Sequence, residues 1–146
     1  MLREKLVEVA LEWQECFGVA PSITSVISEY DAAMLIGMPE NEYSEYMQDK
    51  TAVNKGFDFV FRKIRYQVKA NRPSGKKWSS VTMVPKASNY EWDSLIWILY
   101  DKSYVIQEAW EWKVEDYKHA FDNIKRLSPN HYRQGKCLYI KGYKLE

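Results

Sequence analysis

Three polar side chains interrupt an otherwise apolar hairpin in the middle of the chain. Asp58 lies in the first of two alternating stretches, and Gln67 and Lys69 lie in the second. If the chain turns symmetrically at Arg62-Lys63, Asp58 faces Gln67 on one side of the hairpin, and Lys69 lies two residues further along that side. Because Arg-Lys is not a favoured two-residue turn, we expect a looser loop that keeps this register. A carboxylate, an amide oxygen and a lysine so placed could bind Mg²⁺ and act on a phosphoryl group.

The hydrophobic pattern predicts the elements that position these residues. Apolar residues recur at three- and four-residue steps over 2–17, as on one face of a helix. Ser22 is the expected N-cap of a second helix, and after Gly56 the period changes to two. This order indicates an α/β (α+β) fold with a mixed central sheet flanked by helices. The predicted elements are helices over 2–17, 22–36 and 114–127, strands over 57–61, 64–70, 95–100, 104–112 and 137–140, and optionally a short strand over 81–84.

Two short motifs give the hairpin a family resemblance. Gly56-Phe57-Asp58 followed by Gln67-Val68-Lys69 resembles the PD-(D/E)XK pattern, which is an Asp at the start of one strand and then an acid or Gln, any residue and Lys on the next. The segment 28–37, which covers most of the second expected helix, is similar to the helix that precedes this hairpin in the family, with Glu29 as the matching acid. The resemblance covers about residues 22–127 and implies a restriction-endonuclease-like αβββαβ core, as in restriction and homing endonucleases.

The resemblance also implies a role for each residue. Asp58 would be the central metal ligand and Gln67 a second ligand, with the Val68 carbonyl completing the set. Lys69 would be the catalytic lysine, and Glu29 would bind or orient metal-bound water. The implied cofactor is Mg²⁺, with Mn²⁺ able to substitute.

The sequence departs from the family pattern at two positions, and a second acid could fill the role of Glu29. Position 67 is Gln rather than an acid, which lowers the negative charge at a metal, and Phe57 replaces the Pro of the pattern. Asp31 competes with Glu29 for the helix position. Each side chain also has a structural alternative: Asp58 as a strand-end carboxylate that accepts nearby N–H groups, Gln67 as a cross-strand partner, and Lys69 as a surface lysine.

The charge is distributed unevenly along the 146 residues, although the formal net charge is only +1. Residues 1–58 hold 11 acidic and 4 basic side chains, whereas residues 59–90 hold 8 basic ones and no acid. A second tract without acids covers 123–145. Two such tracts favour one cationic face for a polyanion. The residues expected to contact DNA are Arg62, Lys63, Arg65, Arg72, Lys76, Lys77, Trp78, Arg133 and Lys136.

Length favours a single domain over 1–146, which the resemblance makes nuclease-like, with an N-terminal helix (1–20), the core (22–127) and a basic C-terminal tail (128–146). No apolar stretch is long enough to span a membrane, so no membrane partner is expected. For Cys16 and Cys137 we expect two buried thiols rather than a disulfide, as in an intracellular protein, here of prokaryotic or phage origin.

The expected function is therefore a Mg²⁺-dependent endonuclease that hydrolyses phosphodiester bonds of double-stranded DNA, of restriction or homing type. Cleavage of both strands by one small domain implies a homodimer or homotetramer. The alternative is a non-catalytic module that keeps the nuclease fold for DNA binding or assembly.

Overall fold

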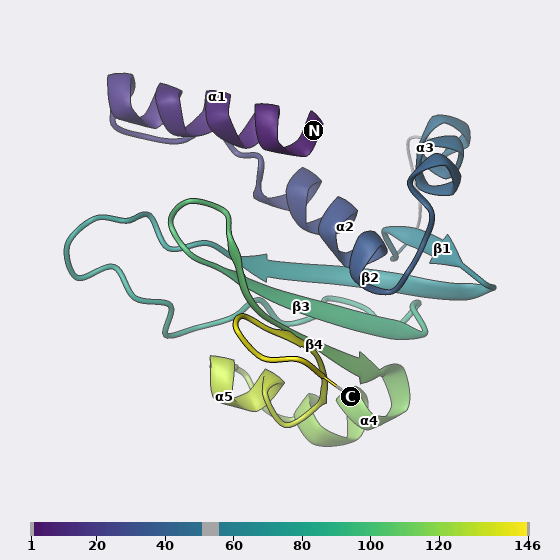
Figure 1. Cartoon of the computed structure of the whole chain (residues 1–146). Helices are drawn as coiled ribbons and strands as arrows, with labels where there is room; N and C mark the ends of the chain where they lie inside the picture. Colours follow the sequence, from purple (N-terminus) through teal and green to yellow (C-terminus); the bar gives the residue numbers. More distant parts are fainter. Residues whose placement is uncertain (1, 51–55, 146) are drawn as a thin grey trace.

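The computed structural model describes residues 2–50 and 56–145 and has a five-stranded mixed sheet at its centre (Figure 1). The strands lie in chain order across the sheet. β2 and β3 are parallel, and the other three neighbouring pairs are antiparallel. The predicted mixed α+β class is therefore confirmed. The strands are β1 (Phe59–Phe61), β2 (Ile64–Asn71), β3 (Ser94–Tyr100), β4 (Ile106–Lys113) and β5 (Lys136–Ile140).

Helices cover both faces of this sheet. The three N-terminal helices lie over one face, and the two short C-terminal helices lie over the other (Figure 1). From α2 onward, the order within the described residues is ααββββααβ, which has one strand and two helices more than the expected αβββαβ. The helices are α1 (Leu2–Phe17), α2 (Thr24–Leu35), α3 (Glu40–Asp49), α4 (Val114–Phe121) and α5 (Pro129–Tyr132).

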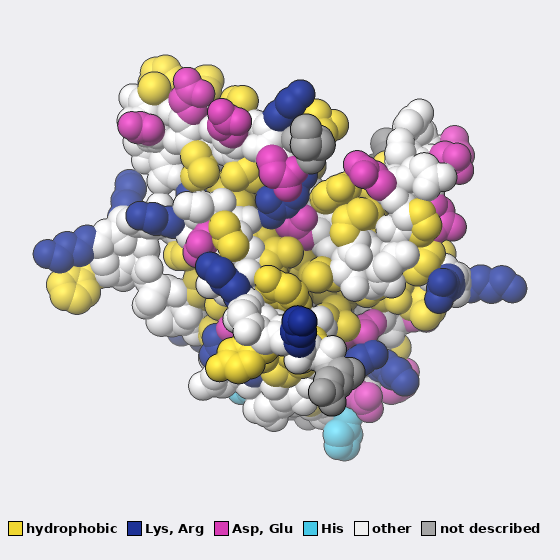
Figure 2. All heavy atoms as spheres, in the orientation of Figure 1, with side chains coloured by type: hydrophobic (Ala, Val, Ile, Leu, Met, Phe, Trp, Pro, Cys, Tyr) yellow, Lys and Arg dark blue, Asp and Glu magenta, His cyan; other side chains and the backbone are white. Residues whose placement is uncertain are grey.

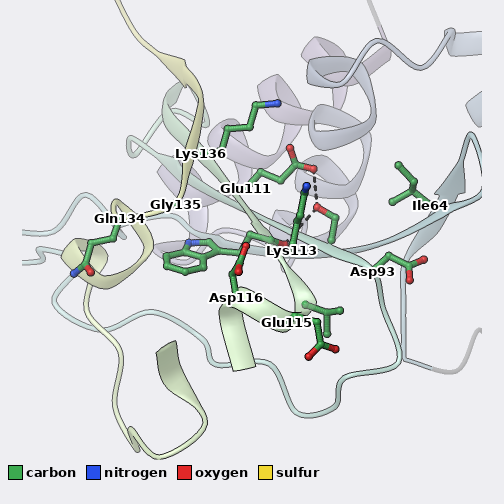
Figure 3. Close-up of a pocket in the computed structure, with 12 residues that line it drawn as sticks. Ile64, Asp93, Glu111, Lys113, Glu115, Asp116, Gln134, Gly135 and Lys136 are labelled. Carbon is green, nitrogen blue, oxygen red and sulfur yellow. Dashed lines mark hydrogen bonds between the residues drawn. The ribbon is translucent and has the colours of Figure 1, made fainter. Parts of the chain in front are cut away.

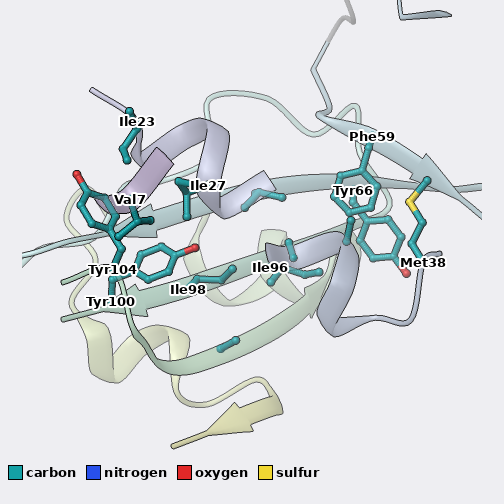
Figure 4. Close-up of a cluster of buried hydrophobic side chains, with 14 of the residues drawn as sticks. Val7, Ile23, Ile27, Met38, Phe59, Tyr66, Ile96, Ile98, Tyr100 and Tyr104 are labelled. Carbon is teal, nitrogen blue, oxygen red and sulfur yellow. The ribbon is translucent and has the colours of Figure 1, made fainter. Parts of the chain in front are cut away.

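β3 is covered by a hydrophobic layer on each of its two faces. Ile96 and Ile98 pack toward α2 and the β1–β2 hairpin (Figure 4), whereas Leu95 and Trp97 pack toward α4 and α5. Successive strand side chains point to opposite faces, so a strand covered on both sides must be apolar throughout. The prediction that 95–100 is a strand buried on both faces is confirmed.

Buried polar contacts fasten α1 to the rest of the fold. Arg3 donates two hydrogen bonds to the Asp31 carboxylate on α2, at 2.7 and 2.8 Å, and a third to the Tyr104 carbonyl. The Tyr100 hydroxyl also donates to this carboxylate, at 2.6 Å, and shares the Oδ2 oxygen with the second Arg3 bond. The ion pair is well shielded, because only 6% of the Asp31 side chain is exposed. α1 therefore has a fixed orientation on the body.

Several predicted boundaries are wrong. Ser22 is not the N-cap of α2, because the helix begins at Thr24 after Ile23 donates its N–H to the Pro21 carbonyl. The strand expected to begin at residue 104 begins at Ile106, because Tyr104 adopts a left-handed turn conformation with φ of 61°.

The remaining differences concern the length of elements. The helix expected over 114–127 ends at Phe121, and the optional strand over 81–84 is reduced to one bridge between Val84 and Leu127. The strand expected over 57–61 begins at Phe59. The strand expected over 137–140 is confirmed as β5, the last strand of the sheet, whereas α5 in the predicted basic tail was not expected.

The two cysteines are both free, but they are not two buried thiols. Cys16 is exposed because it lies on the outer side of α1, and Cys137 is half-buried in β5. Within the described ranges, none of the helices combines the length and the hydrophobicity that crossing a membrane requires.

Candidate active site

The β1–β2 hairpin has the predicted register but a tighter turn than expected. Phe61 pairs with Ile64, so Arg62 and Lys63 alone form the turn, and Phe59 pairs with Tyr66. Both turn residues have positive φ, 50° and 67°, which is the conformation of a type I′ turn. This turn matches the twist of the strands, and it is formed here without the usual Asn or Gly.

Asp58 lies immediately before β1, where the hairpin holds it by main chain and side chain. Its N–H donates to the Tyr66 carbonyl at 2.7 Å, and its Oδ2 accepts the Val68 N–H at 2.7 Å. The second bond places the carboxylate against the segment between Gln67 and Lys69. The alternative of a strand-end carboxylate that accepts a nearby N–H is therefore confirmed, and the role of Asp58 as a metal ligand stays a prediction.

Glu29 reaches Asp58 from α2. Burial raises the pKa of Glu29 from 4.5 to about 7, and the charge of Asp58 and a hydrogen bond with it also raise this pKa, whereas the charge of Lys50 lowers it. The raised pKa of Glu29 indicates that the two carboxylates lie close together in a poorly solvated space, where ionisation of both is unfavourable. This mutual repulsion is what a cation placed between them would relieve.

A small cavity of about 280 Å³ brings the predicted catalytic set together. It is enclosed by the start of α2, by the end of the β1–β2 hairpin and by Pro85. The four predicted catalytic residues and the predicted carbonyl ligand all line it: Glu29, Asp58, Gln67, Val68 and Lys69.

Residues that the sequence analysis did not assign also surround the two carboxylates. Lys50 donates from Nζ to the Asp58 carbonyl at 3.0 Å. The pKa of Tyr43 on α3 is raised, first by burial and then by the charges of Glu29 and Asp58. Both residues come from the acidic N-terminal part of the chain, and no local motif indicated them. The one usable signal is that Lys50 is among the few cations before residue 56.

Asp31 does not belong to the site. Both oxygens of its carboxylate accept hydrogen bonds from Arg3, and Oδ2 also accepts one from the Tyr100 hydroxyl. The competition between Asp31 and Glu29 is therefore decided in favour of Glu29, which lines the cavity with Asp58.

Three arginines of the predicted DNA-binding set bind protein groups. Arg65 pairs with Asp93 at 3.0 Å, and Arg133 pairs with Glu108 at 2.6 Å. The Arg72 guanidinium lies 4.4 Å above the Tyr104 ring and donates to the Lys102 carbonyl and to Gln14 on α1. Arg72 also lines a second cavity, of about 370 Å³, together with Lys76 and Thr24. Because Thr24 lines both cavities, this cationic cavity adjoins the catalytic one.

The other predicted DNA contacts lie in separate places. Arg62 and Lys63 form the hairpin tip at one end of β2, and Lys76, Lys77 and Trp78 belong to the loop beyond its other end (Figure 1). Trp78 is 89% exposed, with Lys77 Nζ 5.4 Å from its ring centroid. The structure thus brings Arg72 and Lys76 next to the catalytic cavity and leaves the hairpin tip away from it.

A larger cavity, of about 760 Å³, lies elsewhere, between the end of β4, the start of α4 and the α5–β5 connection (Figure 3). Lys136 of the predicted DNA-binding set lines it. Of the four carboxylates that line it, Asp93 and Glu111 accept hydrogen bonds, from Arg65 and from the Ser94 hydroxyl, and Glu115 and Asp116 are exposed at the start of α4. None of the predicted catalytic residues lines this larger cavity, whereas all of them line the smaller one.

The donor set at the catalytic cavity suits a hard cation. Two carboxylates, one amide oxygen and one main-chain carbonyl are the ligand types that Mg²⁺ accepts, because it retains several waters. A cluster of three or more His, Cys, Asp or Glu side chains that could hold a metal is absent over residues 2–50 and 56–145. Among the residues that line this cavity, negative charge is thus limited to Glu29 and Asp58, because position 67 is Gln rather than an acid.

Comparison with known families returned no matching family model, and no curated protein sequence matched the chain significantly.

Proposed function

We propose that the chain is a Mg²⁺-dependent endonuclease that hydrolyses double-stranded DNA. One observation carries the proposal: Glu29 and Asp58 share a cavity that raises the Glu29 pKa to about 7, and Gln67 and Lys69 line the same cavity. Perturbed carboxylates in a concave site with a lysine are typical of a catalytic centre. The restriction-endonuclease-like core belongs to this proposal, with α2 and the β1–β2 hairpin as its catalytic elements.

The residues divide the chemistry between them. Asp58, Glu29, the Gln67 amide oxygen and the Val68 carbonyl would hold the cation. When bound, Mg²⁺ supplies Lewis-acid stabilisation of charge on the phosphoryl group and activates a water molecule for attack. The Lys69 ammonium would offset the developing negative charge on the phosphate, and Pro85 lines the same cavity.

The cationic cavity next to the site supports a backbone path for DNA. Arg72 is held by the Lys102 carbonyl and Gln14, and Lys76 lies near it along the same cavity. Lys77 and Trp78 extend this side of the molecule into solvent. Contacts of this kind position the duplex through its phosphates, and an exposed Trp adds a surface on which a base can stack.

Cleavage of supercoiled plasmid DNA with Mg²⁺, with Mn²⁺ or with EDTA tests the proposal. We expect nicking that requires the metal, and a loss of at least about 100-fold in Asp58→Asn and in Lys69→Ala. The matched controls are Glu115→Gln and Lys125→Ala, an exposed acid and an exposed lysine outside the site. Equal cleavage by all variants, or no cleavage by the wild type, would refute the proposal.

Gln67 favours one alternative, a non-catalytic module that binds DNA. With one acid fewer than most family patterns, the cavity could serve phosphate contact alone. This alternative predicts DNA binding that weakens steeply with salt and does not change with Mg²⁺. A gel-shift titration in Mg²⁺ and in EDTA separates it from the nuclease.

A further inference from the structure

The outer side of α1 carries an apolar stripe that nothing in the described structure covers. Exposed apolar residues recur along it at four- and three-residue steps, with Phe17 against Trp13 at 4.7 Å between ring centroids. Hydrophobic side chains gather at the outer edge of the molecule over α1 (Figure 2). We define the outer stripe as Leu2 (78% exposed), Leu6 (37%), Val9 (59%), Trp13 (52%) and Phe17 (69%).

The stripe cannot turn inward, because an adjacent side of α1, about a quarter turn away around the helix, already packs on the body. Val7 and Ala10 are buried in the core. Arg3 holds the start of the helix through Asp31, and Gln14 holds its end by donating to the Ser74 carbonyl. α1 therefore presents two apolar sides, and only one of them serves the fold of this chain.

Leu2, Leu6, Val9 and Trp13 alternate four- and three-residue spacings, which is the a/d pattern that packs one helix against another. We propose that the outer stripe is the interface of a homodimer, in which α1 packs antiparallel to α1 of a second copy about a two-fold axis. In this arrangement Leu6 lies near Val9 of the other copy. The inference does not depend on the proposed nuclease activity.

The charges along one flank of the stripe select the antiparallel direction. Lys5 and Glu12 are both exposed and occupy equivalent flanking positions, one heptad apart. In an antiparallel pair these flanks meet, so Lys5 of each copy lies beside Glu12 of the other and two symmetric ion pairs form. In a parallel pair the same flank would meet Ala10 and Phe17 instead, and the charges would gain no partner.

The area of the stripe fits a weak dimer. The four side chains that face one another in this register, Leu2, Leu6, Val9 and Trp13, offer on the order of 100 Å² each, so the pair buries about 800 Å² in total, within the range of weak, transient interfaces. We therefore expect a dissociation constant in the micromolar range.

Sedimentation velocity of the full chain, from about 5 to 300 µM, measures this association. We expect dimerisation of the wild type and a dissociation constant at least about tenfold higher for Trp13→Glu. Met83→Glu is the matched control, because Met83 is 54% exposed on the connection between β2 and β3. A wild type that stays monomeric over this range overturns the proposal and leaves the stripe to a different partner.

Charge exchange tests the direction of packing. Lys5→Glu and Glu12→Lys each place like charges together and should weaken self-association about tenfold. An equimolar mixture of the two variants should restore it, because every flank contact then joins Glu to Lys. No restoration on mixing, with circular dichroism showing both variants folded, refutes the antiparallel pair. All these variants lie outside the catalytic cavity, so failure here would leave the proposed function unaffected.

Discussion

Replacing Glu29 by Gln should stabilise the metal-free protein at neutral and alkaline pH. Folding raises the Glu29 pKa from 4.5 to about 7, so between these values the folded state binds more protons than the unfolded state. The free energy of unfolding therefore falls as pH rises through this window, and it is constant with respect to Glu29 above and below it. Glu29→Gln removes this ionisation and with it the loss.

The size of the effect follows from the pKa. A pKa difference of one unit corresponds to about 1.4 kcal/mol. The rise of the Glu29 pKa from 4.5 to about 7 therefore limits the stabilisation by Glu29→Gln at pH 8 to about 3 kcal/mol. Because Glu29 titrates together with Asp58 and Lys50 partly compensates, we expect about 1–3 kcal/mol. The stabilisation should shrink to about 0.4 kcal/mol near pH 4.5, where the folded carboxyl is protonated and the unfolded one is half protonated, and it should vanish below that pH.

Urea unfolding in EDTA at four pH values between 4.5 and 8 measures this difference. Glu115→Gln is the control, because it removes an exposed carboxylate at the start of α4. Mg²⁺ at pH 8 should stabilise the wild type more than Glu29→Gln. If the difference between wild type and Glu29→Gln does not change with pH, the carboxylates do not repel each other as argued, and the reasoning fails.

Three further predictions concern stability, each measured by urea or thermal unfolding. Arg3→Ala should cost about 3 kcal/mol, because it leaves the buried Asp31 carboxylate without its cation; a cost below about 1 kcal/mol would contradict the role of this pair. Gly135→Ala should cost about 1–3 kcal/mol, because a Cβ there would lie 2.5 Å from Trp112 Nε1; an unchanged Tm would show that the Trp112 ring can move aside. Lys63→Gly should stabilise the protein by about 1 kcal/mol, because φ is 67° at this turn position; a lower Tm would mean that the lysine makes contacts that outweigh the strain.

The sequence predicted the hairpin well because two local signals agreed. Alternation gave the strand faces, and pairing across a two-residue turn set Phe59 opposite Tyr66. The uninterrupted apolar run of β3 predicted burial on both sides. Such signals are local, so they do not depend on how distant parts of the chain meet.

What the sequence could not supply are contacts between distant segments. Lys50 reaches Asp58 only because α3 returns over the hairpin. Arg3, at the start of α1, binds Asp31 on α2, 28 residues away in the sequence. Counting basic residues likewise overstated the free cationic surface. Arg65 and Arg133 bind Asp93 and Glu108, acids that lie far away in the sequence.

The connection between β2 and β3 has a consequence for how the chain folds. These two strands are parallel and adjacent, yet residues 72–93 join them without any helix or strand of their own. Closing so long a loop costs entropy before any pairing compensates for it, and non-local pairing of this kind slows folding. The hairpin β1–β2 can form early on its own, whereas Gln67 and Lys69 gain their final surroundings only when β3 has docked. We therefore expect the candidate site to be completed late in folding, by the slowest pairing in the sheet.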